Sequence, residues 1–586
     1  MKPVRLPAAA TLALPRWAIF GLGLLYILPG LIGRDPWKDD AASFGIMWTM
    51  AHGGINDWLM PNIAGLPAAE EGPLAFWLGA LCIKLFGWLL GDVMAARVST
   101  IGIFVTGALS VWYTAFHLGR RADAQPLRLA FGGQPEPNDY GRTLADTATL
   151  IYLGCLGLLL HSHETLAVTL QGSLLAYFLY RAVRYVEAPG PRNAVLIGVA
   201  LGTLTLTRGW LSPVTLTLAL ALCTHFLDMP MARTLRDLAT AVLVALLITL
   251  IWIVPSAVLH PLNLSPVESW MAWNFSQIGL PSWDSLKAFF KVGIWFFWPA
   301  WPFALWAIYA WRRQRHLLHI VLPLSFVGAL TLLILFDPSP ENGDLLKLLP
   351  PLAIMAAFGL PAMKRGAINA IDWFSVMVLT MIAAVTWLWW IATLTGWPHQ
   401  LAKNAARLLP GFHAEFGLLS FLVAAAATIG WFVLVHWRIS RQPAVLWRAV
   451  VLSSGGLILF WVLLMTLLLP QLNFGKSYRA VAQQIVAHVP EGSDCIATNV
   501  GPAQRASFAY YGPLAFAGAG VTQCNLLLLQ DSVDLKDDRE IQPAFRGKQW
   551  SLLWEGRRAI DRRERFRLYR RVSGVPTPPA AAAPAR

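Results

Sequence analysis

Helix-length apolar runs separated by short polar segments are the feature that most constrains this chain. A helix needs about 20 mostly apolar residues to cross a membrane, and thirteen stretches approach that length. With 56% hydrophobic and 13% charged residues, the chain is not an ordinary soluble globule. The alternating segments of about ten residues found in membrane β-barrels are absent. We therefore expect an all-α polytopic membrane protein with about 13 spans, at residues 17–33, 97–118, 143–160, 165–183, 193–207, 211–227, 238–256, 290–311, 317–336, 348–363, 372–394, 413–437 and 449–470.

The positions of the basic residues predict how these spans are oriented. Lys and Arg favour cytoplasmic loops, and an inside N-terminus places the arginine-rich segments 120–142, 181–192 and 312–315 in the cytoplasm. The net charge of +14 therefore indicates topology and not a nucleic-acid partner. Thirteen crossings place the C-terminus on the outer side of the membrane. The first apolar run lacks a convincing cleavage site, so we expect a retained anchor.

Two apolar segments are expected to lie on the periplasmic surface. Residues 73–90 are nearly long enough to cross, but they contain Lys84, and a crossing there would move every later basic cluster outside. In residues 39–52, the apolar side chains Phe44, Met47 and Trp48 recur at helical spacing. Such a stripe is typical of an interfacial helix.

The composition changes after residue 470, which predicts a second domain. We assign residues 1–470 to a transmembrane domain and 471–573 to a small periplasmic α/β domain, with a helix in SYRAVAQQIVAHV followed by strand-like runs. The Pro/Ala-rich residues 574–586 are expected to be disordered. Cys495 and Cys524 both fall in the second domain, where the compartment permits a disulfide. Sequence does not show their separation, so the pairing is left open.

Several polar residues are expected to collect on the periplasmic face. Carboxylates there can orient or deprotonate a hydroxyl acceptor, while Arg and Lys can hold a phosphate. Together they suit group transfer from a phosphate-activated donor. Structural alternatives are a helix-capping Asp39, a solvated Glu71, a span-boundary Glu164, a snorkelling Arg208 and a surface-anchoring Lys347. The whole set is Asp39, Asp40, Glu70, Glu71, His161, His163, Glu164, Arg208, Asn274, Asp337 and Lys347; the two histidines are a weak metal signal.

The order of several short motifs resembles the GT-C membrane glycosyltransferases of the protein-mannosyltransferase superfamily. It is most similar to the bacterial enzymes that move aminoarabinose from a polyprenyl phosphate to lipid A. The resemblance runs from about residue 16 to 470, and no single motif in it is specific. The matching segments are Asp39-Asp40, Glu70-Glu71-Gly72-Pro73, Leu85-Phe86-Gly87, Glu164, Thr207-Arg208-Gly209, Trp298-Pro299-Ala300-Trp301 and Lys347-Leu348-Leu349-Pro350.

The resemblance implies roles for individual residues. Asp39 would be the main catalytic acid or base, with Glu71 and Glu164 as further catalytic residues that hold the acceptor or the sugar. Arg208 and Lys347 would grip the donor phosphate, and Asp40 and Asn274 would contribute to substrate binding. Gly72 departs from the family, which has Lys there, and Trp273-Asn274 replaces a Glu-Asn or Glu-His pair. These departures leave the sugar, the acceptor and a divalent metal open, and no cofactor is certain.

The expected function is transfer of a sugar from a polyprenyl (undecaprenyl) phosphate donor to a lipid or glycan acceptor of the cell envelope, such as lipid A. A protein O-glycosyltransferase is an alternative within the enzyme class. A transporter or flippase for the lipid-linked sugar is another, although it predicts internal repeats and polar residues at mid-membrane depth. A third is an inactive relative whose outer domain binds envelope partners.

Overall fold

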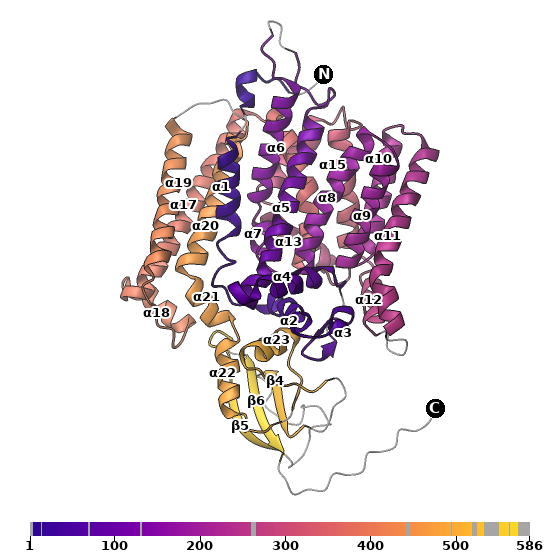
Figure 1. The fold of residues 1–586 in the computed structure, drawn as a ribbon. Helices are drawn as coiled ribbons and strands as arrows, with labels where there is room; N and C mark the ends of the chain where they lie inside the picture. Colours follow the sequence, from indigo (N-terminus) through magenta and orange to yellow (C-terminus); the bar gives the residue numbers. More distant parts are fainter. Residues whose placement is uncertain are drawn as a thin grey trace.

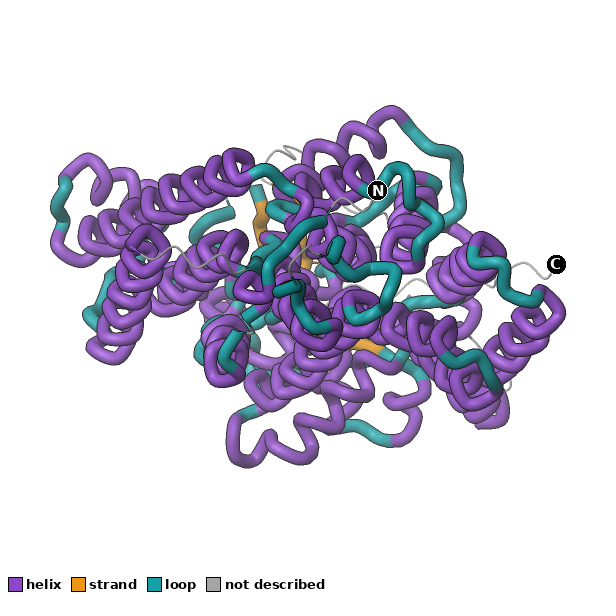
Figure 2. The backbone as a smooth tube through the Cα atoms, turned by 90° about the horizontal axis from the view of Figure 1, so that it is seen from above, coloured by secondary structure: helices purple, strands orange, loops and turns teal. Residues whose placement is uncertain are grey.

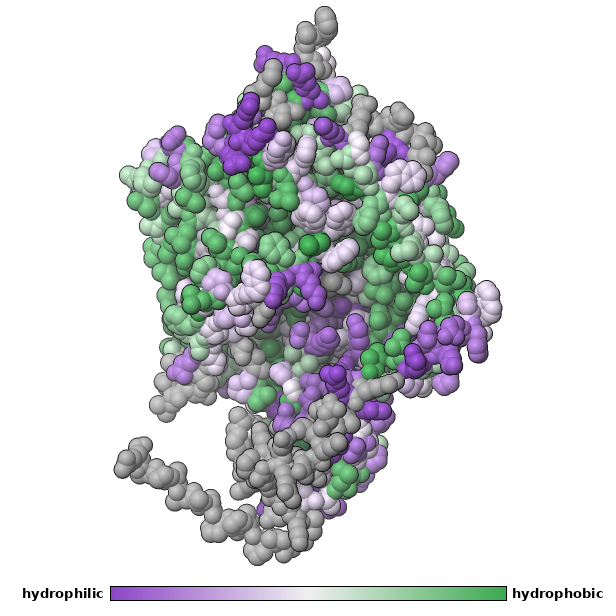
Figure 3. All heavy atoms as spheres, turned by 180° about the vertical axis from the view of Figure 1, so that it is seen from behind, coloured by the Kyte–Doolittle hydropathy of each residue, from purple (hydrophilic) through white to green (hydrophobic). Residues whose placement is uncertain are grey.

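The computed structural model describes residues 4–12, 14–67, 71–128, 132–259, 265–440, 446–493, 495–518, 524–532, 550–561 and 563–571. Helices packed side by side form a bundle, with a small sheet-containing domain at one end and η1 (Ala8–Thr11) at the other (Figure 1). Viewed along the helices, the bundle is elongated and the strands lie behind it (Figure 2). On the face seen in Figure 3, hydrophobic residues form a broad band across the bundle, and hydrophilic residues gather at both ends. This is the surface of a multi-pass membrane protein with a C-terminal domain outside the membrane.

Seven helical segments of the described chain are long and apolar enough to cross a membrane, or eight if one bent pair counts as a single span. Helices also occupy the other predicted spans, but the total of thirteen crossings stays a prediction. The seven segments are α5 (Asp92–Gly119), α11 (Met231–Leu259), α15 (Leu318–Leu335), η2–α16–η3 (Asn342–Leu348, Leu349–Gly359 and Leu360–Ala362), α17 (Arg365–Thr395), α19 (Leu418–Ser440) and α20 (Arg448–Leu467). The remaining predicted spans correspond to α1 (Arg16–Ile27), α8 (Ala167–Glu187), α9 (Pro191–Thr207), α10 (Leu211–Phe226) and two broken helices.

Those two predicted spans are not continuous helices, and the prediction was wrong there. Span 290–311 divides into α13 (Trp283–Phe296) and α14 (Ala300–Ala310), which are bent by 99°. Pro299 lies at the break, and a proline lacks the N–H that a continuous helix requires. Span 143–160 likewise divides into α6 (Pro137–Leu153) and α7 (Leu156–His161). Hydropathy is uniform across both breaks, so it did not reveal them.

Short elements cover the end of the bundle that faces the C-terminal domain (Figure 1). They are α2 (Lys38–His52), α3 (Ile55–Leu59), the hairpin β1 (Asn62–Ile63) and β2 (Leu66–Pro67), and α4 (Leu74–Leu90). Helix α4 keeps an exposed apolar face that includes Trp88, which is 83% exposed, as a surface helix requires. The apolar stripe of α2 is covered instead, because Phe44 contacts Tyr510 and Met47 approaches Gly79 of α4. Interpreting that stripe as membrane-facing was wrong.

The C-terminal domain packs against α2 from the other side. It contains α21 (Leu469–Lys476), α22 (Arg479–His488), α23 (Pro502–Tyr511) and a sheet of order β3-β4-β6-β5. Strand β3 (Ile496–Thr498) is parallel to β4 (Leu526–Ser532), whereas β6 (Glu564–Arg571) is antiparallel to β4 and to β5 (Trp550–Gly556). This small mixed domain confirms the predicted helix and strand-like runs, although α23 was not predicted. Residues 574–586 lie outside the described part of the chain.

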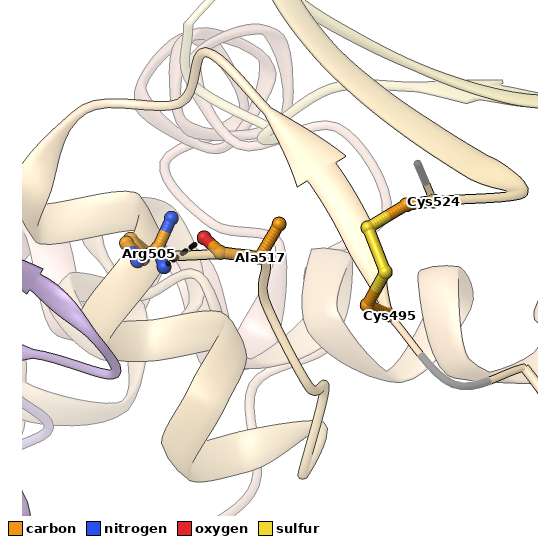
Figure 4. The surroundings of a disulfide bond; sticks show 4 residues. All are labelled: Cys495, Arg505, Ala517 and Cys524. Carbon is orange, nitrogen blue, oxygen red and sulfur yellow. Dashed lines mark hydrogen bonds between the residues drawn. A yellow bond between two sulfur atoms is a disulfide. The ribbon is translucent and has the colours of Figure 1, made fainter. Parts of the chain in front are cut away.

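A disulfide and an arginine tie this domain together and to α2 (Figure 4). Cys495 and Cys524 are bonded, with Cα atoms 5.3 Å apart, which answers the question that sequence left open. Arg505 of α23 donates hydrogen bonds to the carbonyl of Ala517 and to the carbonyls of Ile63 and Ala64 in the hairpin. The guanidinium therefore joins the C-terminal domain to the segment that follows α2.

Candidate active site

The predicted site residues lie at the end of the bundle next to the C-terminal domain. Figure 1 places α2, α4 and α12 (Ser265–Ser276) at this end. Contacts with these elements show where other predicted residues lie. Arg208 pairs with Glu71, which precedes α4. Asn274 of α12 accepts a hydrogen bond from the amide of Trp210, two residues after Arg208. Thr165, next to Glu164, donates to Asp40. Glu70 lies outside the described residues.

A buried ion-pair cluster surrounds Arg208, which joins α9 to α10. Its Nε lies 2.5 Å from a Glu71 carboxylate oxygen, and its Nη1 lies 2.7 Å from Asp344 Oδ1. Its Nη2 is 3.4 Å from Glu341. Lys347 Nζ is 2.7 Å from the same Asp344 oxygen, so two cations face three carboxylates. Arg208, Asp344 and Lys347 are buried and shield one another's charges from water, whereas Glu341 at the edge of the cluster is exposed.

Two glycines allow the chain to approach this cluster closely. Gly209 has a φ of +157°, and a Cβ there would lie 2.0 Å from Asn274 Oδ1. At Gly72, a Cβ would lie 2.1 Å from the carbonyl oxygen of Leu206 in α9. A side chain at Gly72 would require the backbone of α9 or of the turn to move, and one at Gly209 would require the Asn274 amide to move. The turn at Gly72 packs closely against α9 because it has no side chain there, such as the lysine that the motif resemblance predicts.

A small cavity that is open to solvent lies beside the cluster. Three predicted substrate-binding residues line it together: Arg208, Asn274 and Lys347. Asp337 also lines it, as predicted for a residue of this face. Gln171, Ser212 and Gln277, which the sequence did not single out, add neutral polar groups to the walls. Such a mixture of charged and neutral hydrogen-bonding groups suits a ligand with a sugar and an ionised group.

Asp40 is the centre of a separate buried network at the start of α2. Its Oδ2 accepts from Arg34 Nη2 at 3.1 Å and from Arg97 Nη2 at 3.0 Å. Its Oδ1 accepts from both the amide and the hydroxyl of Thr165, each at 2.8 Å. Burial raises the pKa of Asp40, but the two guanidinium groups and Thr165 outweigh it and hold the pKa below its usual range. All these contacts give Asp40 the environment of a structural anchor.

Asp39 and Glu164 do not line the cavity. The Asp39 side chain is exposed and forms no hydrogen bond or ion pair with any residue in the described ranges. Glu164 is half-buried, with a carboxylate oxygen 3.0 Å from His161 Nδ1. Contacts along α8 connect this region with the cavity, because Gly343 of η2 packs on Val168 close to Thr165. The structure therefore places the predicted residues in two neighbouring groups at one end of the bundle.

Two acids near Arg208, Glu71 and Asp337, have raised pKa values. Burial raises the pKa of Glu71, Arg208 lowers it, and the nearby Glu341 and Asp344 raise it, with a net increase. Burial also raises the pKa of Asp337. Burial lowers the pKa of Arg208, but Glu71, Asp344 and Glu341 raise it to a larger extent, so the guanidinium stays charged. A carboxyl with a raised pKa beside a permanent cation is a common feature of catalytic sites.

Several residues of these networks were not predicted. Arg97 opens a predicted span and was treated as part of it, although an arginine at such a place is costly unless it is paired. Asp344 precedes Lys347 by three residues, a helical acid–base spacing that could have drawn attention to it. Arg34 and Glu341 carry no signal beyond their charge.

The predicted residues do not assemble an evident metal site. Among the residues that the structure describes, no three His, Cys, Asp or Glu side chains gather closely enough to hold an ion. His163 is fully buried, and its ring nitrogens contact the carbonyls of Tyr26 and Leu159. Burial lowers its pKa to about 3, so it is a neutral packing residue. A divalent metal stays a prediction.

Comparison with known proteins supports the fold. No protein-family model and no curated protein matches the sequence. Among solved structures, the chain is similar to ArnT from Cupriavidus metallidurans bound to undecaprenyl phosphate, with a TM-score of 0.62 and 15% identity over 94% of this chain and 98% of that one. The apo state of the same protein gives a TM-score of 0.60 and 16% identity, over 94% and 97%. This likeness confirms the GT-C type of fold that the motif order predicts.

Proposed function

We propose that this protein transfers a sugar from a polyprenyl phosphate to an acceptor of the cell envelope, on the side of the membrane that holds the C-terminal domain. The observation that carries the proposal is one cavity lined by Arg208, Asn274 and Lys347, at the same end of the bundle as α2 (Figure 1), where Asp39 is exposed and forms no ion pair with any described residue. It occurs in a fold similar to that of an ArnT bound to undecaprenyl phosphate. We expect that side to be the periplasm and the acceptor to be lipid A or a related glycolipid.

In the proposed reaction, an acceptor oxygen attacks C1 of the sugar as the C1–oxygen bond to the donor phosphate breaks. The acceptor proton passes to the Asp39 carboxylate, and the polyprenyl phosphate leaves with the electron pair of the broken bond. Attack from the face opposite the phosphate gives inversion at C1. Asp39 suits the role of base because its side chain is exposed and forms no hydrogen bond or ion pair with any described residue.

Arg208 and Lys347 are proposed to hold the donor in the cavity. The cations would neutralise charge on the leaving phosphate, and the carboxylates around them would both orient the cations and accept hydrogen bonds from sugar hydroxyls. Asn274 holds Trp210 through a 3.1 Å hydrogen bond and keeps its place beside Gly209, so it would shape the cavity wall. Glu71 and Glu164 are proposed to orient the acceptor or the sugar, and Asp40 to position α2.

A transfer assay with the purified protein in lipid tests this function. Polyprenyl-phosphate sugars of defined structure are supplied with a glycolipid acceptor, and the glycosylated product and free polyprenyl phosphate are measured together. If the protein transfers the sugar, the glycosylated product and free polyprenyl phosphate should appear in equal amounts. A transporter would move the intact sugar lipid between leaflets and release no free polyprenyl phosphate, which would refute the proposal.

A further inference from the structure

We propose that a second phosphate group binds at the start of α2, outside the cavity that Arg208 lines. The site, which we call the Trp37 corner, consists of Arg34, Trp37, Lys38 and Lys476. This inference rests on the proposed function, because it assigns a further anionic part of the substrates to the surface beside Asp39.

The indole ring of Trp37 brings together cations from distant parts of the chain. The guanidinium carbon of Arg34 lies 5.3 Å from the ring centroid, and Nζ of Lys476, the last residue of α21, lies 4.9 Å from it. Lys38 is the next residue after Trp37 and is exposed. The ring therefore contacts two positive side chains, and a third, Lys38, begins the first turn of α2.

Two N–H groups of the corner lack an acceptor. Arg34 is only 3% exposed, and its Nη2 donates to Asp40 and to the carbonyl of His163. Its Nε, and Nε1 of Trp37, are buried and have no hydrogen-bond partner in the described part of the chain. Buried donors are nearly always satisfied in proteins, so each points to a missing acceptor.

The first turn of α2 adds to the preference for an anion. Trp37 occupies the N-cap position, and no side chain caps the backbone N–H groups there. A helix N-terminus with free N–H groups attracts phosphate. Together with the two unpartnered donors, it leaves several N–H groups facing one short segment.

The Trp37 corner differs from the Arg208 cluster in how its cations are paired with carboxylates. Arg208 and Lys347 are already matched by Glu71, Asp344 and Glu341. By contrast, Lys38 and Lys476 form no ion pair with any residue in the described ranges. Burial lowers the pKa of Lys476, and repulsion from Lys38 and Arg34 lowers it further, although Glu164 partly opposes them. A compact ligand with several anionic oxygens would relieve this repulsion.

The position of the Trp37 corner beside Asp39 restricts which substrate could supply the bound phosphate. Lys38 directly precedes Asp39, so an anion in the corner lies next to the proposed base. A phosphate group could come from the polyprenyl phosphate donor or from a phosphorylated sugar of the acceptor. Both sources have the same chemistry toward these side chains, and a binding measurement separates them.

Equilibrium binding to the full chain in detergent tests the corner. The probes are a short-chain prenyl phosphate, glucosamine 1-phosphate and, for comparison, unphosphorylated glucosamine. The variants are Lys476→Gln and Trp37→Phe, which removes the indole N–H but keeps a ring, together with Lys476→Arg, which preserves the charge. Lys403→Gln removes an exposed lysine of α18 (His399–Leu408) and is the matched control.

Loss of one charge-assisted contact should weaken binding of one phosphate probe by roughly tenfold or more. Weaker prenyl phosphate binding in Lys476→Gln assigns the corner to the donor, and weaker glucosamine 1-phosphate binding assigns it to the acceptor. Lys476→Arg should restore most of the affinity, and Lys403→Gln should leave it unchanged. If both phosphate probes bind Lys476→Gln and Trp37→Phe within twofold of wild type, the inference is overturned. Binding needs no turnover, so a protein that binds phosphate here but transfers no sugar would refute the proposed function alone.

Discussion

Asp39 and Asp40 are neighbours of the same chemistry in opposite environments. Asp39 is exposed, whereas Asp40 is 3% exposed and accepts four hydrogen bonds. Asp40→Ala would leave Arg34 and Arg97 buried without their carboxylate, so we expect a loss of about 3–5 kcal/mol in stability. Asp39→Asn should leave stability unchanged. Thermal unfolding of both variants in lipid measures this difference, and equal unfolding temperatures would contradict it.

The lowered pKa of Asp40 predicts how its contribution to stability changes with pH. The folded pKa is lower than the unfolded value of about 3.9. The stabilisation by Asp40 is therefore complete above that value and is lost as pH falls through the folded pKa. Acid should unfold the wild type progressively below about pH 4, and Asp40→Ala should lack this part of the pH dependence. Unfolding curves of both proteins from pH 3 to pH 7 provide the comparison.

At the scale of single residues, the sequence predicted that certain charged residues gather on one face, but it did not predict their partners. Arg208, Asn274 and Lys347 were expected near one another, and they line one cavity. The carboxylate of Asp344 that joins two of them was not foreseen, because a pairing across 136 residues leaves no local pattern. The structural role of Asp40 was also invisible, since it depends on Arg97 of α5 and on Thr165 in the segment before α8.

At the scale of elements, the turn before α4 should not accept the lysine that the motif resemblance places at residue 72. Gly72→Lys would place a Cβ 2.1 Å from the carbonyl of Leu206, so the turn must move away from α9. We expect a stability loss of about 1–3 kcal/mol and reduced transfer. Gly54→Lys, at a neighbouring exposed glycine with open space around it, is the control. Increased transfer by Gly72→Lys would show that this turn tolerates the cation.

The link between α23 and the hairpin after α2 predicts that the C-terminal domain supports the site. Arg505→Ala would leave the carbonyls of Ile63, Ala64 and Ala517 without this donor. Such unpaired groups cost about 1–3 kcal/mol, and we expect faster protease cleavage of the hairpin and a lower kcat. Arg563→Ala, an exposed arginine in the same domain, should change neither quantity. An intact hairpin in Arg505→Ala would contradict the link.

Helical periodicity and hydropathy predicted where elements lie better than how they are shaped. Helices occupy the predicted spans, and α4 keeps the exposed apolar face of a surface helix. The break at Pro299 and the burial of α2 between α4 and α23 were missed. The burial of α2 depends on contacts with elements far away in the sequence, which local pattern cannot supply, whereas the break coincides with a proline, a local signal that hydropathy does not register.

At the scale of the whole molecule, the account requires the two ends of the bundle to face opposite sides of the membrane. Cysteines placed at Gly54 and Gln134, both exposed, report on the end with the C-terminal domain and on the other end. In a background without Cys82, Cys155 and Cys223, an impermeant thiol reagent should label position 54 from the periplasm and position 134 only after the membrane is opened. Labelling of both from one side would refute this topology.

The central claim is that Asp39 reacts at the end of the bundle where donor and acceptor meet. It is tested most directly by comparing transfer rates of Asp39→Asn and Asp139→Asn with wild type. Both aspartates are exposed and lie in the first turn of a helix, but Asp139 begins α6, which starts at the opposite end. Loss of a general base costs about 10²- to 10⁴-fold, so we predict that decrease in the rate of free polyprenyl phosphate release for Asp39→Asn and no change for Asp139→Asn. Equal rates in the two variants would contradict the claim.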